Sequence, residues 1–409
     1  MTESVKELQI NICDDNIIRV YQLPETGVKI GASLSLSSLQ VRTIQVFTEM
    51  LRQNRLTSYD EFRALGENLY AVLFEDNSIG KVLNGFLQGS EAYSDFSFLR
   101  IKLEFEEKQQ YLEHWPWEYL FCPSINTFLS ERADVILTRY VPVEDIDGAR
   151  SLFVKEAPPL IVLFVAASPD ELGRVQYEYV LDTLKELEEH NAKRIRVDTL
   201  VTPAKQYDTR RNQDDYAPEA TFERFITTLK DVQPHVLHFV GHGKHTNNGG
   251  QLAFVKLDFT EEWIDDHEFV SWFGQIRSLR LVFLQACESV SSDYSPYIIS
   301  GVANYLARLN IPAVIAMKYE IDNDIANIFA TAFYQALVEG KDVDVAVQAG
   351  RENVALNVRN KARSYAFGLP TLYLRGSGGL LPKQITTIED FQGRKRRSRS
   401  QTKRTSTAP

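Results

Sequence analysis

Four short, mainly apolar runs in the second half of the chain constrain its fold more than any other feature. The runs are LIVLFVAA, HVLHFV, LRLVFLQA and AVIAM, which begin at Leu160, His235, Leu279 and Ala313. Strands this apolar are typical of a parallel sheet that is buried on both faces. Helix-like patterns separate the runs, and this alternation predicts an α/β fold with a mostly parallel sheet flanked by helices.

The helices of this half are placed by apolar residues that recur with a helical period. They are expected over Tyr177–His190, Ala220–Asp231, Tyr297–Leu309, Ala326–Val338 and Ala346–Tyr365. Two further strands are expected at RIRVDTLV and TLYLRG.

The first 150 residues have a different, α+β pattern. Strands ELQINI and IIRVYQL precede helices around Leu39–Asn54 and Phe62–Leu73, and FLRIKLEFE follows, whose alternation indicates one solvated face. The aromatic stretch HWPWEYLF is more typical of packing than of a site. We therefore expect an N-terminal α+β portion packed against the sheet domain, and a tail that its composition predicts to be disordered. The three parts are residues 1–150, 151–381 and 382–409.

Charge is distributed unevenly along the chain. The net charge is −10, yet the stretch from Arg394 onward contains seven Arg or Lys and no acid, so the remaining chain carries −17. Such an acidic body argues against binding nucleic acid through the folded surface. The basic tail could bind an anionic surface or nucleic acid, be simply solvated, or be a cleavage site, and the sequence does not choose between these.

Cysteine content and hydropathy indicate the compartment. The three cysteines, Cys13, Cys122 and Cys287, are far apart and odd in number, which argues against a disulfide framework or a cysteine zinc site. No apolar run approaches the length of a membrane span, and the first residues lack the pattern of a signal peptide. We therefore expect a cytoplasmic protein without a membrane contact.

A histidine and a cysteine follow two of the apolar runs. HVLHFV leads into Gly241-His242-Gly243, and LRLVFLQA ends in Cys287. Parallel strands end at a common edge, so the two residues are expected to be neighbours, and an imidazole beside a thiol favours the thiolate needed for acyl transfer. The N–H of a glycine beside the histidine suits an oxyanion hole. The alternative, a small buried hydrophobic cysteine, stays open at this point.

The other histidines around this motif suggest a metal site at first. His235 and His238 lie an odd number of residues apart on a strand and so point to opposite faces, and no zinc motif accompanies them or His245. We therefore expect no metal, and a structural, hydrogen-bonded role for His238 inside the sheet.

Several stretches together resemble the CHAT family, caspase-like cysteine peptidases related to caspases and separase. QAC at Gln285–Cys287 resembles the caspase signature, although Glu288 and Ser289 replace its last two residues. The stretches HWPWEYLF, VLHFVGHG, LVFLQACES and FGLPTLYLRG also resemble the family, and the resemblance covers roughly residues 60–375. It implies a caspase-like fold.

The resemblance also implies site residues. His242 and Cys287 would form a catalytic dyad, the N–H groups of Gly243 and Cys287 an oxyanion hole, and no metal or organic cofactor would be needed. An aspartate after the strand AVIAM would form an acidic S1 pocket for Arg or Lys. Asp322 is the preferred residue, with Asp324 and Glu320 beside it. The alternative for these acids is a helix N-terminus, where negative charge is favoured.

The expected function is therefore a cysteine endopeptidase that cleaves protein substrates, after Arg or Lys. Relatives imply latency until a partner protein or ligand activates the enzyme, and a role in bacterial, including antiviral, defence or regulated cell death. A non-enzymatic CHAT-fold scaffold or sensor is the alternative.

Overall fold

The structure is a computed structural model of the chain. It describes residues 5–23, 29–34, 36–75, 78–89, 97–142, 159–202, 220–246, 249–288, 302–303, 305–307, 311–317, 323–357 and 365–375. The expected tail, residues 382–409, and most of the expected helix Tyr297–Leu309 lie outside these ranges. Within the described residues, no helix is both long and apolar enough to cross a bilayer.

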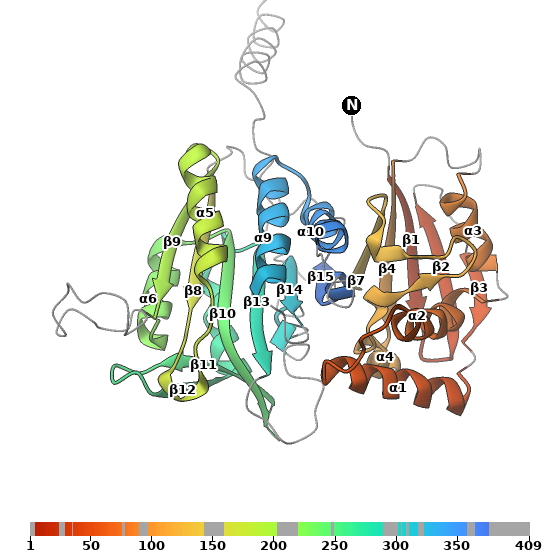
Figure 1. The fold of residues 1–409 in the computed structure, drawn as a ribbon, viewed down its shortest axis with the longest axis horizontal. Helices are drawn as coiled ribbons and strands as arrows, with labels where there is room; N and C mark the ends of the chain where they lie inside the picture. Colours follow the sequence, from red (N-terminus) through yellow and green to blue (C-terminus); the bar gives the residue numbers. More distant parts are fainter. Residues whose placement is uncertain are drawn as a thin grey trace, which may run out of the picture.

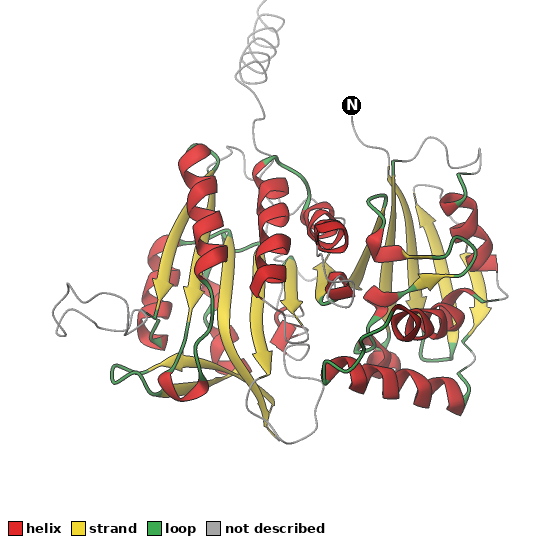
Figure 2. Cartoon of the chain, in the orientation of Figure 1, coloured by secondary structure: helices red, strands yellow, loops and turns green. Residues whose placement is uncertain are grey.

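One mixed, mostly parallel sheet runs through the molecule (Figures 1 and 2), in the order β12-β11-β10-β13-β14-β15-β7-β4-β1-β2-β3, with β8 and β9 attached beside β10. The strands of the C-terminal part are β8 (Leu160–Ala166), β9 (Ile195–Val201), β10 (Val236–Thr246), β11 (Gly249–Val255), β12 (Glu261–Asp265), β13 (Leu281–Glu288), β14 (Ala313–Met317) and β15 (Pro370–Arg375). This confirms the expected fold class.

Helices cover both faces of this part of the sheet. They are α5 (Glu178–His190), α6 (Phe222–Val232), α7 (Asp266–Ser271), α9 (Asn323–Val338) and α10 (Val343–Asn357). The side chains of β8 alternate between two hydrophobic cores, one on each face of the sheet. Val162 and Phe164 belong to the core with α5, α9 and α10, whereas Leu163 and Val165 belong to the core with α6 and α7. Burial on both faces is the reason that these strands are continuously apolar.

Strand β10 corrects one expectation. The apolar run predicts a strand that ends at Val240, but the strand continues through His242 to Thr246. Its first half pairs with β8, and from Gly243 onward its second half pairs with β11 instead. The β11–β12 hairpin was not expected either, because the pairing of β11 depends on its contact with the second half of β10 rather than on its own hydrophobic pattern.

The N-terminal part continues the sheet. Its strands are β1 (Val5–Ile12), β2 (Ile17–Leu23), β3 (Lys29–Ser33), β4 (Phe98–Phe105) and β7 (Val135–Val141), with a small hairpin of β5 (Phe121–Cys122) and β6 (Thr127–Phe128). Its helices are α1 (Ser38–Arg52), α2 (Tyr59–Phe74), α3 (Ser78–Leu87) and α4 (Gln110–Glu113). β7 pairs with β15 in parallel, so the N-terminal portion joins the C-terminal sheet edge to edge.

The strands and helices predicted for this part are confirmed, and the predicted exposure of its strands is wrong on one point. Helices α1 and α2 begin at capping boxes of Ser37 and Ser58, close to the expected starts. The aromatic stretch packs as expected, with Trp117 fully buried. The expected solvated face of FLRIKLEFE is wrong, because Arg100 and Lys102 are buried and pair with carboxylates of other elements.

Candidate active site

His242 and Cys287 lie opposite each other in the sheet. β10 and β13 are parallel neighbours, and their register pairs His242 with Cys287. Neighbouring strands are about 4.8 Å apart, and paired residues of parallel strands point to the same face. The two residues are therefore neighbours in the sheet, as the sequence indicated. The side chain of Cys287 lies outside the described part, so the dyad itself stays a prediction.

The imidazole of His242 is largely buried, with 8% of the residue exposed. Its Nε2 lies 3.0 Å from the carbonyl oxygen of Gly173. A carbonyl can only accept, so Nε2 carries the proton and the neutral ring has its acceptor lone pair on Nδ1. Burial lowers the pKa of His242, and the hydrogen bond to Gly173 opposes this shift. At neutral pH the ring is therefore an uncharged base.

The loop after β8 holds Gly173 in place. Gly173 has a φ of 83°, which side chains rarely tolerate. The Ser168 hydroxyl accepts from the N–H of Val175 at 3.0 Å. On its outer side the loop is tied to the β11–β12 turn, because the Asp170 N–H donates to the Phe259 carbonyl at 3.1 Å. Gly173 was not predicted as a site residue, because its only signal in the sequence is an isolated glycine in a polar loop.

His238 lies four residues before His242 on the same strand and has the structural role expected for it. Its ring is fully buried, stacks on Phe283 with centroids 4.2 Å apart, and has Nδ1 2.9 Å from the Tyr334 hydroxyl. Burial lowers the pKa of His238 to about 3. This histidine is therefore neutral, and Tyr334 ties β10 to α9.

His235, the first histidine of the motif, is held by a backbone hydrogen bond. Nδ1 of His235 accepts from the N–H of Ile161 at 3.0 Å, and burial with the nearby Arg280 lowers the pKa of His235 to about 4. The side chain of His245 is outside the described part. Among the described residues no three His, Cys, Asp or Glu side chains form a group that could hold a metal ion.

The remaining expected site residues are described only in part. Gly243 lies within β10, paired with Leu252 of β11 and with Glu288 of β13. Asp324 is exposed in the first turn of α9, as the helix N-terminus alternative expects. Asp322 and Glu320, by contrast, lie outside the described residues.

The two other thiols are engaged elsewhere. Cys13 is buried, accepts from Nη1 of Arg19 at 2.8 Å, and its pKa is raised to about 11, mainly by burial. Cys122 is buried with its Sγ 3.2 Å from the Ser124 hydroxyl. The environment of Cys13 does not favour a thiolate at neutral pH.

The fold and the site together define a class. A helix-flanked, mostly parallel sheet, with a histidine and a cysteine in register on adjacent parallel strands, is a caspase-like peptidase fold. The family model described as CHAT domain matches residues 64–373, well over half of the chain. The chain belongs to the CHAT family, which confirms the resemblance found in the sequence.

Two solved structures are similar to the chain. A chain of the Saccharomyces cerevisiae separase–securin complex aligns with 8% identity and a TM-score of 0.44 over 91% of this chain. This chain spans 30% of the length of that one. Caspase-1 from Spodoptera frugiperda aligns with 12% identity and a TM-score of 0.34, over 60% of this chain and 98% of that chain. The comparison with curated proteins gave no match.

Proposed function

We propose that the chain is a cysteine endopeptidase in which Cys287 is the nucleophile and His242 the general base. His242 takes the proton of the Cys287 thiol, and the thiolate attacks the scissile carbonyl. His242 then returns this proton to the leaving amine as the C–N bond breaks and the thioester forms. His242 then assists water in releasing the acyl group. The N–H groups of Gly243 and Cys287 stabilise the oxyanion. The reaction uses no metal or organic cofactor.

The observation that carries this proposal is the β10–β13 register, which pairs His242 with Cys287. The bond from His242 Nε2 to Gly173 supports it further, because it leaves the basic lone pair on Nδ1. The lowered pKa of His242 is consistent with a neutral base at physiological pH.

For specificity, we propose that Asp322, helped by Asp324 and Glu320, selects Arg or Lys at P1. These acids follow β14, which runs parallel to β13, so they follow the strand end at the same sheet edge as Cys287. A carboxylate facing a basic side chain contributes about 1–4 kcal/mol at an effective dielectric of 20 or more.

For regulation, we propose latency relieved by a partner protein or ligand, in a cytoplasmic defence role, including antiviral defence. The small exposed fraction of His242 supports latency, because a protein substrate has to reach the imidazole. The same burial favours a second candidate, a non-enzymatic CHAT-fold scaffold or sensor.

A peptide library offered to the wild-type chain, with candidate partners added, tests the proposal. We expect cleavage after Arg or Lys that disappears in Cys287→Ala and His242→Ala and persists in the control Cys122→Ala. Asp322→Ala should lose activity on basic substrates while a thiol-directed probe still labels Cys287. Equal labelling of Cys13, Cys122 and Cys287 in the folded chain, or cleavage after acidic residues, would contradict the respective assignments.

A further inference from the structure

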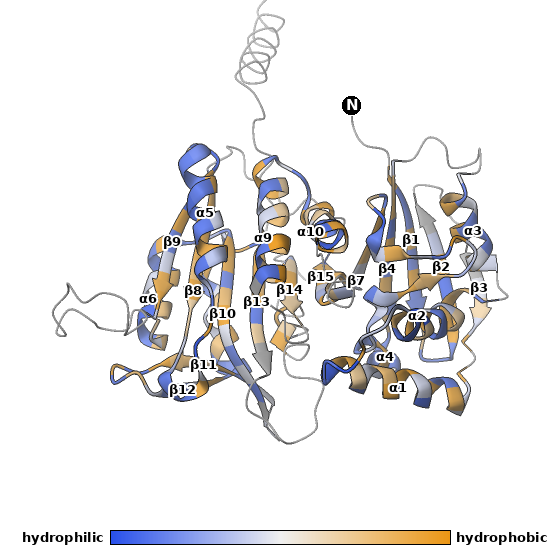
Figure 3. Cartoon of the chain, viewed as in Figure 1, coloured by the Kyte–Doolittle hydropathy of each residue, from blue (hydrophilic) through white to orange (hydrophobic). Residues whose placement is uncertain are grey.

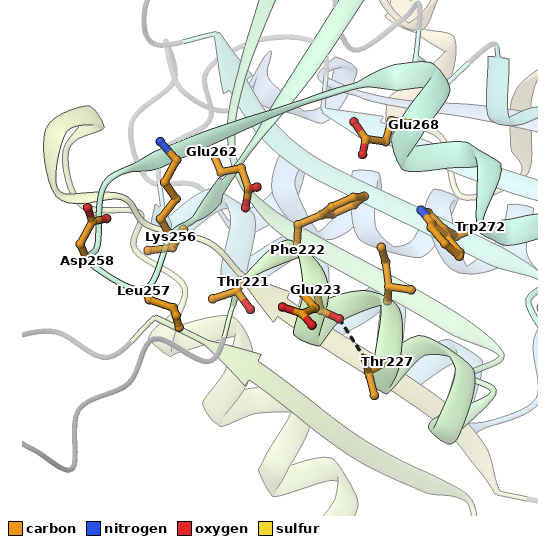
Figure 4. A pocket seen from close by; sticks show the side chains of 12 residues that line it. Thr221, Phe222, Glu223, Thr227, Lys256, Leu257, Asp258, Glu262, Glu268 and Trp272 are labelled. Carbon is orange, nitrogen blue, oxygen red and sulfur yellow. Dashed lines mark hydrogen bonds between the residues drawn. The ribbon is translucent and has the colours of Figure 1, made fainter.

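A groove at the β12 end of the sheet has no part in the proposed chemistry. It lies between α6, the end of β11, β12 and α7, on the sheet face that α6 and α7 cover, and has a volume of about 780 Å³ (Figure 4). β12 is also the last strand at this end of the sheet in the described part of the chain. An edge strand beside a groove suits an extended peptide.

The inside of the groove is apolar. Its lining includes Phe222 and Ile226 from α6, Val255 from β11 and Trp272 after α7. Leu257 lines it as well and is 78% exposed, one of the most exposed large apolar residues of the described chain. An apolar side chain placed here would cover surface that now faces water.

The lining is also strongly acidic. Glu223, Asp258, Glu262 and Glu268 line the groove, against two cations: Lys256 in the lining and Lys230, whose Nζ lies 4.3 Å from the centroid of the Trp272 ring. Figure 4 shows Glu223 on α6 and Glu262 on the neighbouring strand at different sides of it. Hydrogen bonds from the hydroxyl and N–H of Thr260 lower the pKa of Asp258, so this carboxylate is charged at neutral pH. The groove therefore suits a segment that is basic and carries an apolar residue.

We infer that the groove binds the chain's own C-terminal segment, Phe391–Arg404. In that segment an aromatic residue precedes seven Arg or Lys with no acid between them, which complements the groove in charge and in its apolar floor. Phe391 follows the end of β15 by 16 residues, which span up to about 53 Å when extended. β15 lies five strands from β12, or about 24 Å across the sheet, so the segment reaches the groove.

The test uses the full chain carrying Cys287→Ala, so that self-cleavage does not contribute and the outcome is independent of the proposed peptidase activity. Limited trypsin digestion followed by intact mass gives the cleavage rate at the Arg394–Arg397 cluster. We expect the further changes Glu223→Gln/Glu262→Gln/Glu268→Gln to raise this rate several-fold. About 0.5 M NaCl should raise the rate in the chain with an unaltered groove, because salt screens exposed charges. The control Asp182→Asn/Glu186→Gln/Glu189→Gln removes equal charge from α5 and should leave the rate unchanged.

A second measurement does not depend on the groove variant folding. Hydrogen exchange of residues 222–232 and 256–268 should be faster in a chain in which Arg394, Lys395, Arg396 and Arg397 are changed to Gln. Equal trypsin rates in the groove variant and the unaltered chain, or unchanged exchange, would overturn the inference. Protection that increases with protein concentration would assign the groove to a second copy's tail and overturn the intramolecular binding.

Discussion

The C-terminal and N-terminal parts of the sheet are stabilised in different ways. β8 and β14 of the C-terminal part bury almost only apolar side chains, whereas β1, β4 and β7 of the N-terminal part bury charged ones (Figure 3). The buried charges are Lys6, Arg100, Lys102 and Arg139. The stability of the apolar part depends on how completely its side chains fill the core. The stability of the charged part depends on the carboxylates that pair with its buried cations.

Those partners come from distant parts of the chain. Glu7 of β1 contacts Nη1 of Arg100 at 2.9 Å and Nζ of Lys102 at 2.8 Å, and Asp344 of α10 lies 2.5 Å from Nε of Arg100. Glu118 pairs with Arg139. Because α10 also packs on α9 of the C-terminal part, the charged network connects the two parts.

The largest effect is expected from Glu118→Gln. Arg139 is almost completely buried, and Nη2 of Arg351 lies 3.9 Å from the same carboxylate. Removing this charge takes the paired carboxylate from two buried guanidinium groups and leaves Arg139 only the Coulombic attraction of Glu113, which should cost about 3–5 kcal/mol of unfolding free energy. Urea denaturation measures the loss. The control Glu67→Gln breaks an exposed ion pair with Arg63 and should cost at most about 1 kcal/mol. Equal losses in the two variants would show that the buried charges are no more dependent on their partners than exposed ones.

Asp344→Asn tests the link between the two parts. Asp344 is fully buried against Arg100, so the amide keeps the shape but loses a charge-assisted contact worth about 1.5–3 kcal/mol. We expect the urea midpoint to fall while the denaturant slope stays constant. A midpoint equal to that of the wild type would show that Glu7 alone compensates Arg100.

The C-terminal, apolar part should lose unfolding free energy at acid pH because it contains a buried histidine. His238 has a folded pKa of about 3 against an ordinary value of 6.5, so the unfolded state binds the proton first as pH falls. Stability is complete above pH 6.5 and decreases below it, by about 2 kcal/mol at pH 5. His238→Phe/Tyr334→Phe removes both partners of the buried hydrogen bond and should flatten this decrease. His235 shifts in the same direction, so part of the slope remains. An unchanged slope between pH 6.5 and 5 would assign the acid sensitivity elsewhere.

The smallest loss of unfolding free energy is expected from removing one buried methylene, and it should be similar in both parts. Ile315 of β14 and Ile101 of β4 are both fully buried. Ile→Val at either position removes one methylene and should cost about 0.5–1.5 kcal/mol by thermal or urea unfolding. A clearly larger loss at Ile101 would show that the charged part also packs more tightly.

Much of the fold and the site was predictable because the signals were local. Apolar runs located β8, β13 and β14, and the GHG and QAC motifs located His242 and Cys287 before their register was known. The burial of Arg100 was not predictable, since its partners Glu7 and Asp344 lie 93 and 244 residues away in the chain. The same holds for Gly173, whose carbonyl meets His242 only after β8 and β10 pair.

The sequence by itself therefore determined the class of fold, the family and the two residues of the expected dyad. Hydrophobic periodicity and the motifs that follow the strands involve residues close together in the sequence, so they can be recognised without the structure. Tertiary structure decided that β10 continues past His242 into a hairpin with β11, which carbonyl accepts from His242, and which carboxylates neutralise the buried cations. Each of these depends on long-range contacts, because the free energy of a buried polar group is set by the partner that folding brings to it.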